Sequence, residues 1–199
     1  MSLLTLLEYV GTVAFSISGA MVAIDNKMDI FGVVMLGLTT AVGGGMLRDV
    51  ILGNNPPLIF NSPFTIVLAI GVAIICFLPS IRKYIKKADI TIQIMDAIGL
   101  AIFTIVGVET SISYNNLLLS IFVGALTGVG GGALRDIFAH NDLYIFTKHF
   151  YACAAIIGSI VCFYLFKIND NLSILTSFVV IFVLRLCAMK YKWNLPKAK

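Results

Sequence analysis

Two short segments carry most of the residues in this chain that could do chemistry in an apolar environment. They are Gly43-Gly44-Gly45-Met46-Leu47-Arg48-Asp49 and Gly130-Gly131-Gly132-Ala133-Leu134-Arg135-Asp136, and each lies inside a long apolar run. A charge at the centre of a bilayer costs between about 3 and more than about 10 kcal/mol unless it is paired or hydrated. Glycine disfavours a helix by about 1 kcal/mol relative to alanine. Because the chain incurs both costs twice, we predict that these segments do more than pack.

The glycine runs are expected to shape a path for a solute. Three glycines in succession let a helix bend or unwind, which frees backbone carbonyl and amide groups. Within a membrane such groups are tolerated beside protein or a water-filled cavity, where they can coordinate a cation or a small polar solute. Close helix packing is the alternative explanation. The predicted residues of the ion path are Gly43, Gly44, Gly45, Gly130, Gly131 and Gly132.

The charged residues of the two segments are expected to neutralise one another. Arg48 stands three residues after Gly45, about one helical turn further along. Neighbouring residues on a helix point about 100° apart, so Arg48 and Asp49 need not bind each other. We predict crosswise pairing instead, Arg48 with Asp136 and Arg135 with Asp49. These pairs would act either as a gate or as a structural latch, and the sequence leaves both open.

The composition is that of a membrane protein. The chain has 199 residues, of which 59% are hydrophobic and 12% charged, whereas a soluble domain is about 45–50% apolar and about 25% charged. Four cysteines lie in apolar runs with no C-x-x-C pair, and no histidine stands at metal-ligand spacing. We therefore expect no tightly bound metal and no cofactor. The net charge of +4 comes from loops beside the apolar runs, so no nucleic-acid partner is expected.

Hydropathy predicts an all-α membrane protein with seven transmembrane helices. Their expected ranges are 3–24, 30–52, 63–81, 90–112, 117–139, 150–166 and 172–189. Cytoplasmic loops are enriched in Lys and Arg. The loops on the side of the C-terminus hold nearly all of these residues, and the opposite loops hold only Lys167. The predicted orientation therefore places the N-terminus outside and the C-terminus in the cytoplasm.

The chain also contains an internal repeat. Segments 36–49 and 123–136 match at most positions, and Gly11, Phe15 and Gly19 recur upstream as Gly99, Phe103 and Gly107. A repeat of three spans must insert its second copy from the opposite face. This predicts two inverted three-helix repeats plus a seventh helix, with a site near the midplane where the repeats meet.

The expected division of the chain follows from this repeat. The first three-helix repeat covers residues 1–82, and a basic cytoplasmic linker covers residues 83–89. The second, inverted repeat covers residues 90–168. The seventh helix and a basic cytoplasmic tail cover residues 169–199.

A few other polar residues stand within the expected spans. Those that could line the path, or could simply let helices approach, are Thr12, Ser16 and Thr104. Glu8 and Asp96 lie near span ends, where a carboxylate at a helix start is favourable, and we interpret them in that way. Glu109 lies near the outer end of its span and could attract cations at a vestibule.

The duplicated Gly-Gly-Gly-x-x-Arg-Asp motif resembles the prokaryotic trimeric intracellular cation channel (TRIC) family, whose repeated domain also carries a glycine-transporter label. Both copies are complete, and the resemblance covers about residues 1–190. It implies a homotrimer in which each protomer holds an hourglass-shaped pore, kinked at the triple glycines, that conducts K⁺ and other monovalent cations. It also implies the plasma (inner) membrane of a bacterium or archaeon, with membrane lipids as neighbours.

Two functions remain open at this stage. The first is a K⁺ channel gated or latched by the Arg–Asp pairs, and the alternative is a transporter of glycine or another small amino acid. A solute carboxylate would suit Arg48 or Arg135, and an ammonium group would suit Asp49 or Asp136. An enzyme is not expected, because the sequence has no Ser–His–Asp set, no metal cluster and no nucleotide-binding βα unit.

Overall fold

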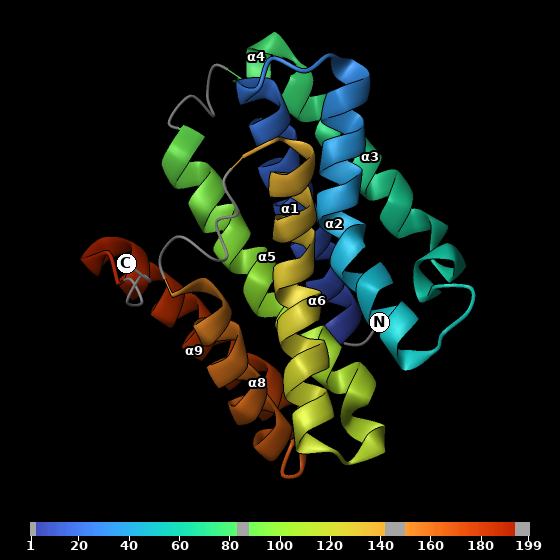
Figure 1. The fold of residues 1–199 in the computed structure, drawn as a ribbon, viewed down its shortest axis with the longest axis vertical. Helices are drawn as coiled ribbons and strands as arrows, with labels where there is room; N and C mark the ends of the chain where they lie inside the picture. Colours follow the sequence, from blue (N-terminus) through green and yellow to red (C-terminus); the bar gives the residue numbers. More distant parts are fainter. Residues whose placement is uncertain (1–2, 83–87, 142–149, 194–199) are drawn as a thin grey trace.

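The computed structural model describes residues 3–82, 88–141 and 150–193. Within these ranges the chain forms eight α-helices and two short 3₁₀ helices (Figure 1). The α-helices are α1 (Leu3–Asp25), α2 (Ile30–Leu52), α3 (Pro63–Phe77), α4 (Pro79–Arg82), α5 (Ala88–Ser111), α6 (Leu117–Phe138), α8 (Tyr151–Phe166) and α9 (Asp170–Tyr191), and the 3₁₀ helices are η1 (Leu58–Asn61) and η2 (Ile112–Tyr114). Most of the predicted basic linker, and the end of the basic tail, lie outside the described residues.

Five of the described helices are long and apolar enough to cross a membrane, namely α1, α2, α5, α6 and α9. Helices α3 and α8 are also apolar but shorter, with 15 and 16 residues. The expected span 63–81 is divided, because α3 ends at Phe77 and α4 starts at Pro79. Proline disfavours the helical conformation of the residue before it, and Leu78 is accordingly extended, with ψ at 129°.

The long helices turn much of their apolar surface outward and keep the charged residues of the two motifs inside. Large hydrophobic side chains such as Phe31, Val50 and Leu118 are 69%, 72% and 78% exposed. The buried groups include Asp49, which is fully buried, and Arg135, which is 4% exposed. Since apolar side chains need no burial against lipid and charged ones do, this distribution is that of a helical membrane protein.

Polar side chains cap several of the long helices. Asp29 accepts a hydrogen bond of 2.8 Å from the backbone N–H of Gly32 at the start of α2. Asn116 and Asn169 cap α6 and α9 in the same way. Each such cap stabilises its helix by about 1 kcal/mol. Helix α2 ends at Leu52 and is capped by Gly53, whose φ of 76° is in the left-handed region that glycine adopts without strain.

Four helices, α1, α2, α5 and α6, pack together at the centre of the molecule (Figure 1). Helix α3 lies against α1 and α2, and α8 lies against α5 and α6. Helix α9 packs on the outer side of α8 and also reaches α5. Any site between the central helices is therefore enclosed by α3 on one flank and by α8 and α9 on the other.

Helices α2 and α6 cross at their triple glycines, where their backbones approach closely. A side chain added at Gly44 would collide with the backbone carbonyl of Thr127, and one added at Gly131 would collide with that of Thr40. The contacts recur in pairs, since Gly43 faces Leu134 just as Gly130 faces Leu47. These pairings run in opposite directions along the two helices, so α2 and α6 are antiparallel.

Both helices stay helical through the glycine runs. Helix α2 is continuous over Ile30–Leu52 and α6 over Leu117–Phe138. Of the two predicted alternatives, unwinding is therefore wrong, because the backbone carbonyl and amide groups stay within the helices; bending at the glycines stays a prediction. The glycines instead remove side chains from the crossing, which lets two backbones touch as small residues do in membrane helix pairs.

Candidate functional site

A cavity of about 370 Å³ opens between the central helices at the end of the molecule where α2 finishes. We call it the Arg48 cavity. Its lining includes Glu8 and Thr12 of α1, Gly45 and Arg48 of α2, and Phe103 and Glu109 of α5. Residues of η1 and the start of α3 form another part of its wall.

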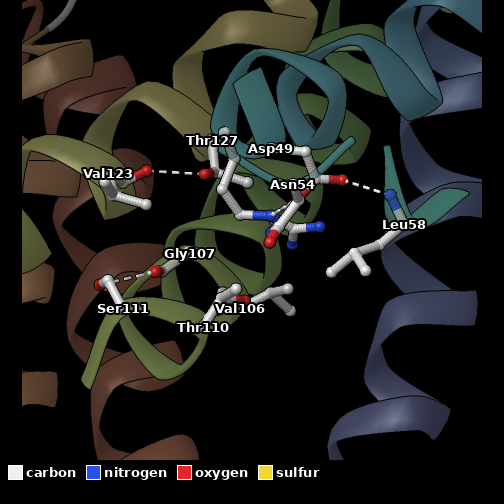
Figure 2. A network of polar contacts seen from close by, with 10 residues as sticks. Asp49, Asn54, Leu58, Val106, Gly107, Thr110, Ser111, Val123 and Thr127 are labelled. Carbon is white, nitrogen blue, oxygen red and sulfur yellow. Dashed lines mark hydrogen bonds and ion pairs between the residues drawn. The ribbon is translucent and has the colours of Figure 1, made fainter. Parts of the chain in front are cut away.

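Arg48 is held within its own motif. Its Nε donates a hydrogen bond of 2.9 Å to Asp49 Oδ1. Asp49 Oδ2 accepts a second hydrogen bond of 2.8 Å from the backbone N–H of Leu58, and Asn54 Nδ2 donates to Oδ1 at 3.4 Å. Figure 2 shows Asp49, Asn54 and Leu58 gathered at this point. The Asp49 carboxylate therefore neutralises Arg48 and fastens the end of α2 to the segment that follows it.

Arg135 lies at the other end of the crossing and binds residues of three helices. Its Nε donates to Asp136 Oδ1 at 2.9 Å, and its Nη1 lies 2.6 Å from both Asp96 Oδ1 of α5 and Ser18 Oγ of α1. The guanidinium side chain is 5% exposed. We call Ser18, Asp96, Arg135 and Asp136 the Arg135 cluster. It joins α1, α5 and α6 through buried polar contacts at this end of the crossing.

The predicted crosswise pairing of the arginines is wrong, because each binds the aspartate next to it. The antiparallel crossing at Gly44 and Gly131 explains the difference. Each arginine stands four residues past its crossing glycine, which is about 6 Å along the axis. The two helices run in opposite directions, so the arginines end about 12 Å apart, too far for the crosswise pairs.

The three hydroxyl residues predicted for the path have different surroundings. Thr12 lines the Arg48 cavity, and its hydroxyl donates to the backbone carbonyl of Glu8 at 2.8 Å. Ser16 donates to the carbonyl of Ala69 in α3 at 2.7 Å, so it faces a helix contact. Thr104 is fully buried against Gly128. The structure therefore brings only Thr12 of these three to the cavity.

One aromatic ring in the cavity wall stacks on a second ring behind it. Phe103 lines the cavity, and its ring stacks on that of Phe15 with centroids 5.3 Å apart. Phe15 is 1% exposed and lies against Gly131 of the second motif. The aromatic pair therefore connects the wall of the Arg48 cavity to the second glycine motif.

Two carboxylates were underestimated from the sequence. Asp96 and Glu8 were interpreted as helix-start residues, yet Asp96 binds Arg135 and Glu8 lines the cavity. The repeat itself carried the missing signal. Glu8 stands three residues before Gly11, and Asp96 stands three residues before Gly99, the matching glycine.

Comparison with known proteins identifies the family. A family model described as "Glycine transporter" matches residues 5–80 and 93–167. The UPF0126 inner membrane protein YadS of Escherichia coli (strain K12) is 34% identical over 96% of this chain and 93% of its own length. A chain solved in work on conductance through TRIC cation channels is 36% identical, covers 100% of this chain and 98% of its own, and has a TM-score of 0.89. The chain belongs to the prokaryotic TRIC family.

Other TRIC relatives agree with this assignment. The orthologue from Rhodobacter sphaeroides is 29% identical, covers 96% of this chain and 99% of its own, and has a TM-score of 0.89. A TRIC channel from C. elegans is 16% identical with a TM-score of 0.66, which shows a shared fold alone. The TRIC structures are described as cation channels, whereas the family model carries the name of a transporter. These names describe channels and membrane proteins, not enzymes.

Proposed function

We propose that this protein is a channel for K⁺ and other monovalent cations in the plasma (inner) membrane of a bacterium or archaeon. The observation that carries the proposal is the Arg48 cavity, which lies among α1, α2 and α5 and reaches the first triple glycine at Gly45. Both motif arginines are neutralised by adjacent carboxylates, so neither presents an uncompensated positive charge to a cation. TRIC relatives described as cation channels share the fold at 36% and 29% identity.

The proposed architecture has seven spans, with α3 and α8 added to the five long apolar helices. Helices α1–α3 would form one repeat, α5, α6 and α8 the inverted second, and α9 would stand outside both. The paired contacts at the α2–α6 crossing support a twofold relation between these units. The bias of Lys and Arg supports an N-terminus outside and a cytoplasmic C-terminus. The Arg48 cavity would then open outward.

The proposed gate is the Arg135 cluster at the cytoplasmic end. One arginine there joins α1, α5 and α6 through buried charged hydrogen bonds. Removing one partner of such a buried pair costs about 3–5 kcal/mol, so the cluster favours the closed arrangement. Opening would require α6 to bend at its glycines and carry Arg135 into water. Asp49 by contrast also accepts a hydrogen bond from the backbone of Leu58. The Arg48–Asp49 pair would therefore act as a structural latch that holds the end of α2.

We further propose that the protein forms a homotrimer embedded among lipids, with one path in each protomer. The support is the description of the Rhodobacter sphaeroides relative as a trimeric channel. The exposed apolar side chains on α2, α6 and α9 provide surfaces for lipid or for a second protomer. Chemical crosslinking in native membranes, resolved by mass, would test the oligomeric state.

Single-channel recording on purified protein in a planar bilayer tests the channel function. We expect unitary currents in KCl whose reversal potential follows the K⁺ gradient. An empty-membrane control and a preparation denatured before reconstitution exclude leak currents. The absence of unitary currents from folded, reconstituted protein would refute the channel.

The alternative function is transport of glycine or another small amino acid. It is favoured by the description of the family model and by the presence of a guanidinium and carboxylates in one cavity. Saturable glycine uptake into proteoliposomes, in the absence of unitary currents, would support this alternative. Unitary currents without uptake would exclude it.

A further inference from the structure

The Arg48 cavity holds more negative than positive charge. Among the described residues, three carboxylates line it, those of Glu8, Asp49 and Glu109, together with one guanidinium, that of Arg48. Asp49 already binds Arg48 at 2.9 Å. Within the part of the chain that the structure describes, Glu8 and Glu109 have no basic side chain at ion-pair distance. Both are partly exposed, so two carboxylates outside the ion pairs of Arg48 and Arg135 face the cavity.

The two ends of the molecule use equivalent carboxylates differently. Asp96, which matches Glu8 in the repeat, forms an ion pair with Arg135, in which Asp96 Oδ1 lies 2.6 Å from Arg135 Nη1. Glu8 is not bound to Arg48 in this way, because Arg48 pairs instead with Asp49, which the backbone of Leu58 anchors. Glu8 therefore remains available to a solute, although the same position in the other half serves an internal ion pair.

Threonine hydroxyls on the cavity wall add oxygen atoms suited to a cation. Thr12 donates its hydrogen to the carbonyl of Glu8 at 2.8 Å, and Thr110 donates to the carbonyl of Val106 at 2.7 Å (Figure 2 shows the second pair). A hydroxyl whose hydrogen is engaged can act towards a solute only as an acceptor. Both residues line the cavity, where their free lone pairs favour a cation over an anion.

We propose that Glu8 and Glu109 give the Arg48 cavity a negative electrostatic potential that concentrates hydrated monovalent cations in the cavity and excludes anions from it. Clefts lined by charge of one sign and walled by protein focus the field and raise local counter-ion concentration by about 10-fold or more. The effect of this potential on conduction rests on the proposed channel function. The potential itself can be measured without any current.

The test measures the potential with a cysteine reporter. Thr65→Cys places a thiol on the cavity wall contributed by α3, at a partly exposed position, in a background where the native cysteines are replaced by alanine. The probes are a trimethylammonium-ethyl and a sulfonato-ethyl methanethiosulfonate, one cationic and one anionic. The ratio of their reaction rates changes about sevenfold for each kT of potential, since the two probes respond in opposite directions.

We expect Glu8→Gln and Glu109→Gln each to lower the ratio of cationic to anionic rates by several-fold, and the double variant to lower it further. The effect should shrink between about 0.1 M and about 1 M KCl, because the Debye length falls from about 10 Å to about 3 Å. Asp25→Asn is the control, since this exposed carboxylate lies at the far end of α1 and does not line the cavity. An unchanged ratio in the double variant, or an equal drop in the control, would overturn the proposal.

Reversal potentials in a KCl gradient give a second measurement. In the double variant we expect the preference for K⁺ over Cl⁻ to fall by about 3- to 10-fold at low salt. A wild-type protein that carries no current, but whose reporter ratio still depends on Glu8 and Glu109, would refute the channel and leave the cavity potential supported. A conducting protein whose reporter ratio and selectivity ignore both carboxylates would support the channel and refute this inference.

Discussion

Asp96→Asn is the sharpest test of the proposed gate. The Asp96 carboxylate lies 2.6 Å from Arg135 Nη1, and both groups are buried. Asparagine keeps the shape and one acceptor oxygen but removes the negative charge. Loss of a buried partner costs about 3–5 kcal/mol, and a hydrogen bond to a charged group contributes about 1.5–3 kcal/mol. Since Asp136 and Ser18 still bind Arg135, we take about 2 kcal/mol as the net loss.

This loss applies to the closed arrangement, because a released and hydrated Arg135 does not need Asp96. At about 1.4 kcal/mol for each factor of ten, the ratio of open to closed channels should rise about 30-fold. The assay is the open probability in single-channel records under fixed KCl and voltage. Unitary conductance should change little, since Asp96 lies away from the Arg48 cavity.

Glu8→Gln is the matched control for Asp96→Asn, because it neutralises the equivalent carboxylate without touching the Arg135 cluster. Its open probability should stay at the wild-type value. Melting of each variant in detergent verifies that the protein is folded. An Asp96→Asn protein that folds, conducts normally and opens no more often than wild type would refute the role of the Arg135 cluster as a gate.

Three further variants test the contacts around the two motifs. Ser18→Ala removes one neutral partner of Arg135 and should raise the open-to-closed ratio about fivefold, the equivalent of about 1 kcal/mol, in the same recordings. Asp49→Asn removes the charge that neutralises Arg48 and should destabilise the protein by about 3 kcal/mol, measured as a lower melting temperature in detergent; an unchanged value would contradict the latch. Gly44→Ala places a methyl group against the Thr127 carbonyl and should cost about 1–3 kcal/mol, whereas Gly71→Ala, which meets no atom within 4 Å, should melt at or above the wild-type temperature.

Sequence patterns predicted where the long helices lie. The expected ranges 30–52 and 117–139 coincide closely with α2 and α6, because long apolar runs bounded by Asp, Asn and Gly leave few other choices. The break at Leu78 was missed, although Pro79 marks it, because the hydropathy of the run continues across it. Helix positions therefore follow from local chemistry, and their interruptions follow from proline sterics.

The partners of the arginines could not be predicted in the same way. The carboxylate that Arg135 binds depends on how α1 and α5 pack beside α6. A shift of either helix by one turn would have placed other residues beside Arg135. The role of Gly44 and Gly131 could not be predicted either. Glycines at these positions suit both an ion path and a close contact between helices. The repeat did contain the relation of Glu8 to Asp96, and aligning the halves beyond their glycines would have exposed it.

The backbone contact between Gly44 and Gly131 also has a mechanical consequence. Two helices whose backbones touch over a short stretch without side chains can bend or rock about that stretch but cannot easily slide past it. The two motif arginines lie on opposite sides of this crossing, each about 6 Å from it along its own helix. A rocking motion of α6 that pulls Arg135 away from α5 also moves the part of α6 on the other side of the crossing by a similar amount. The two ends of the molecule are therefore mechanically coupled.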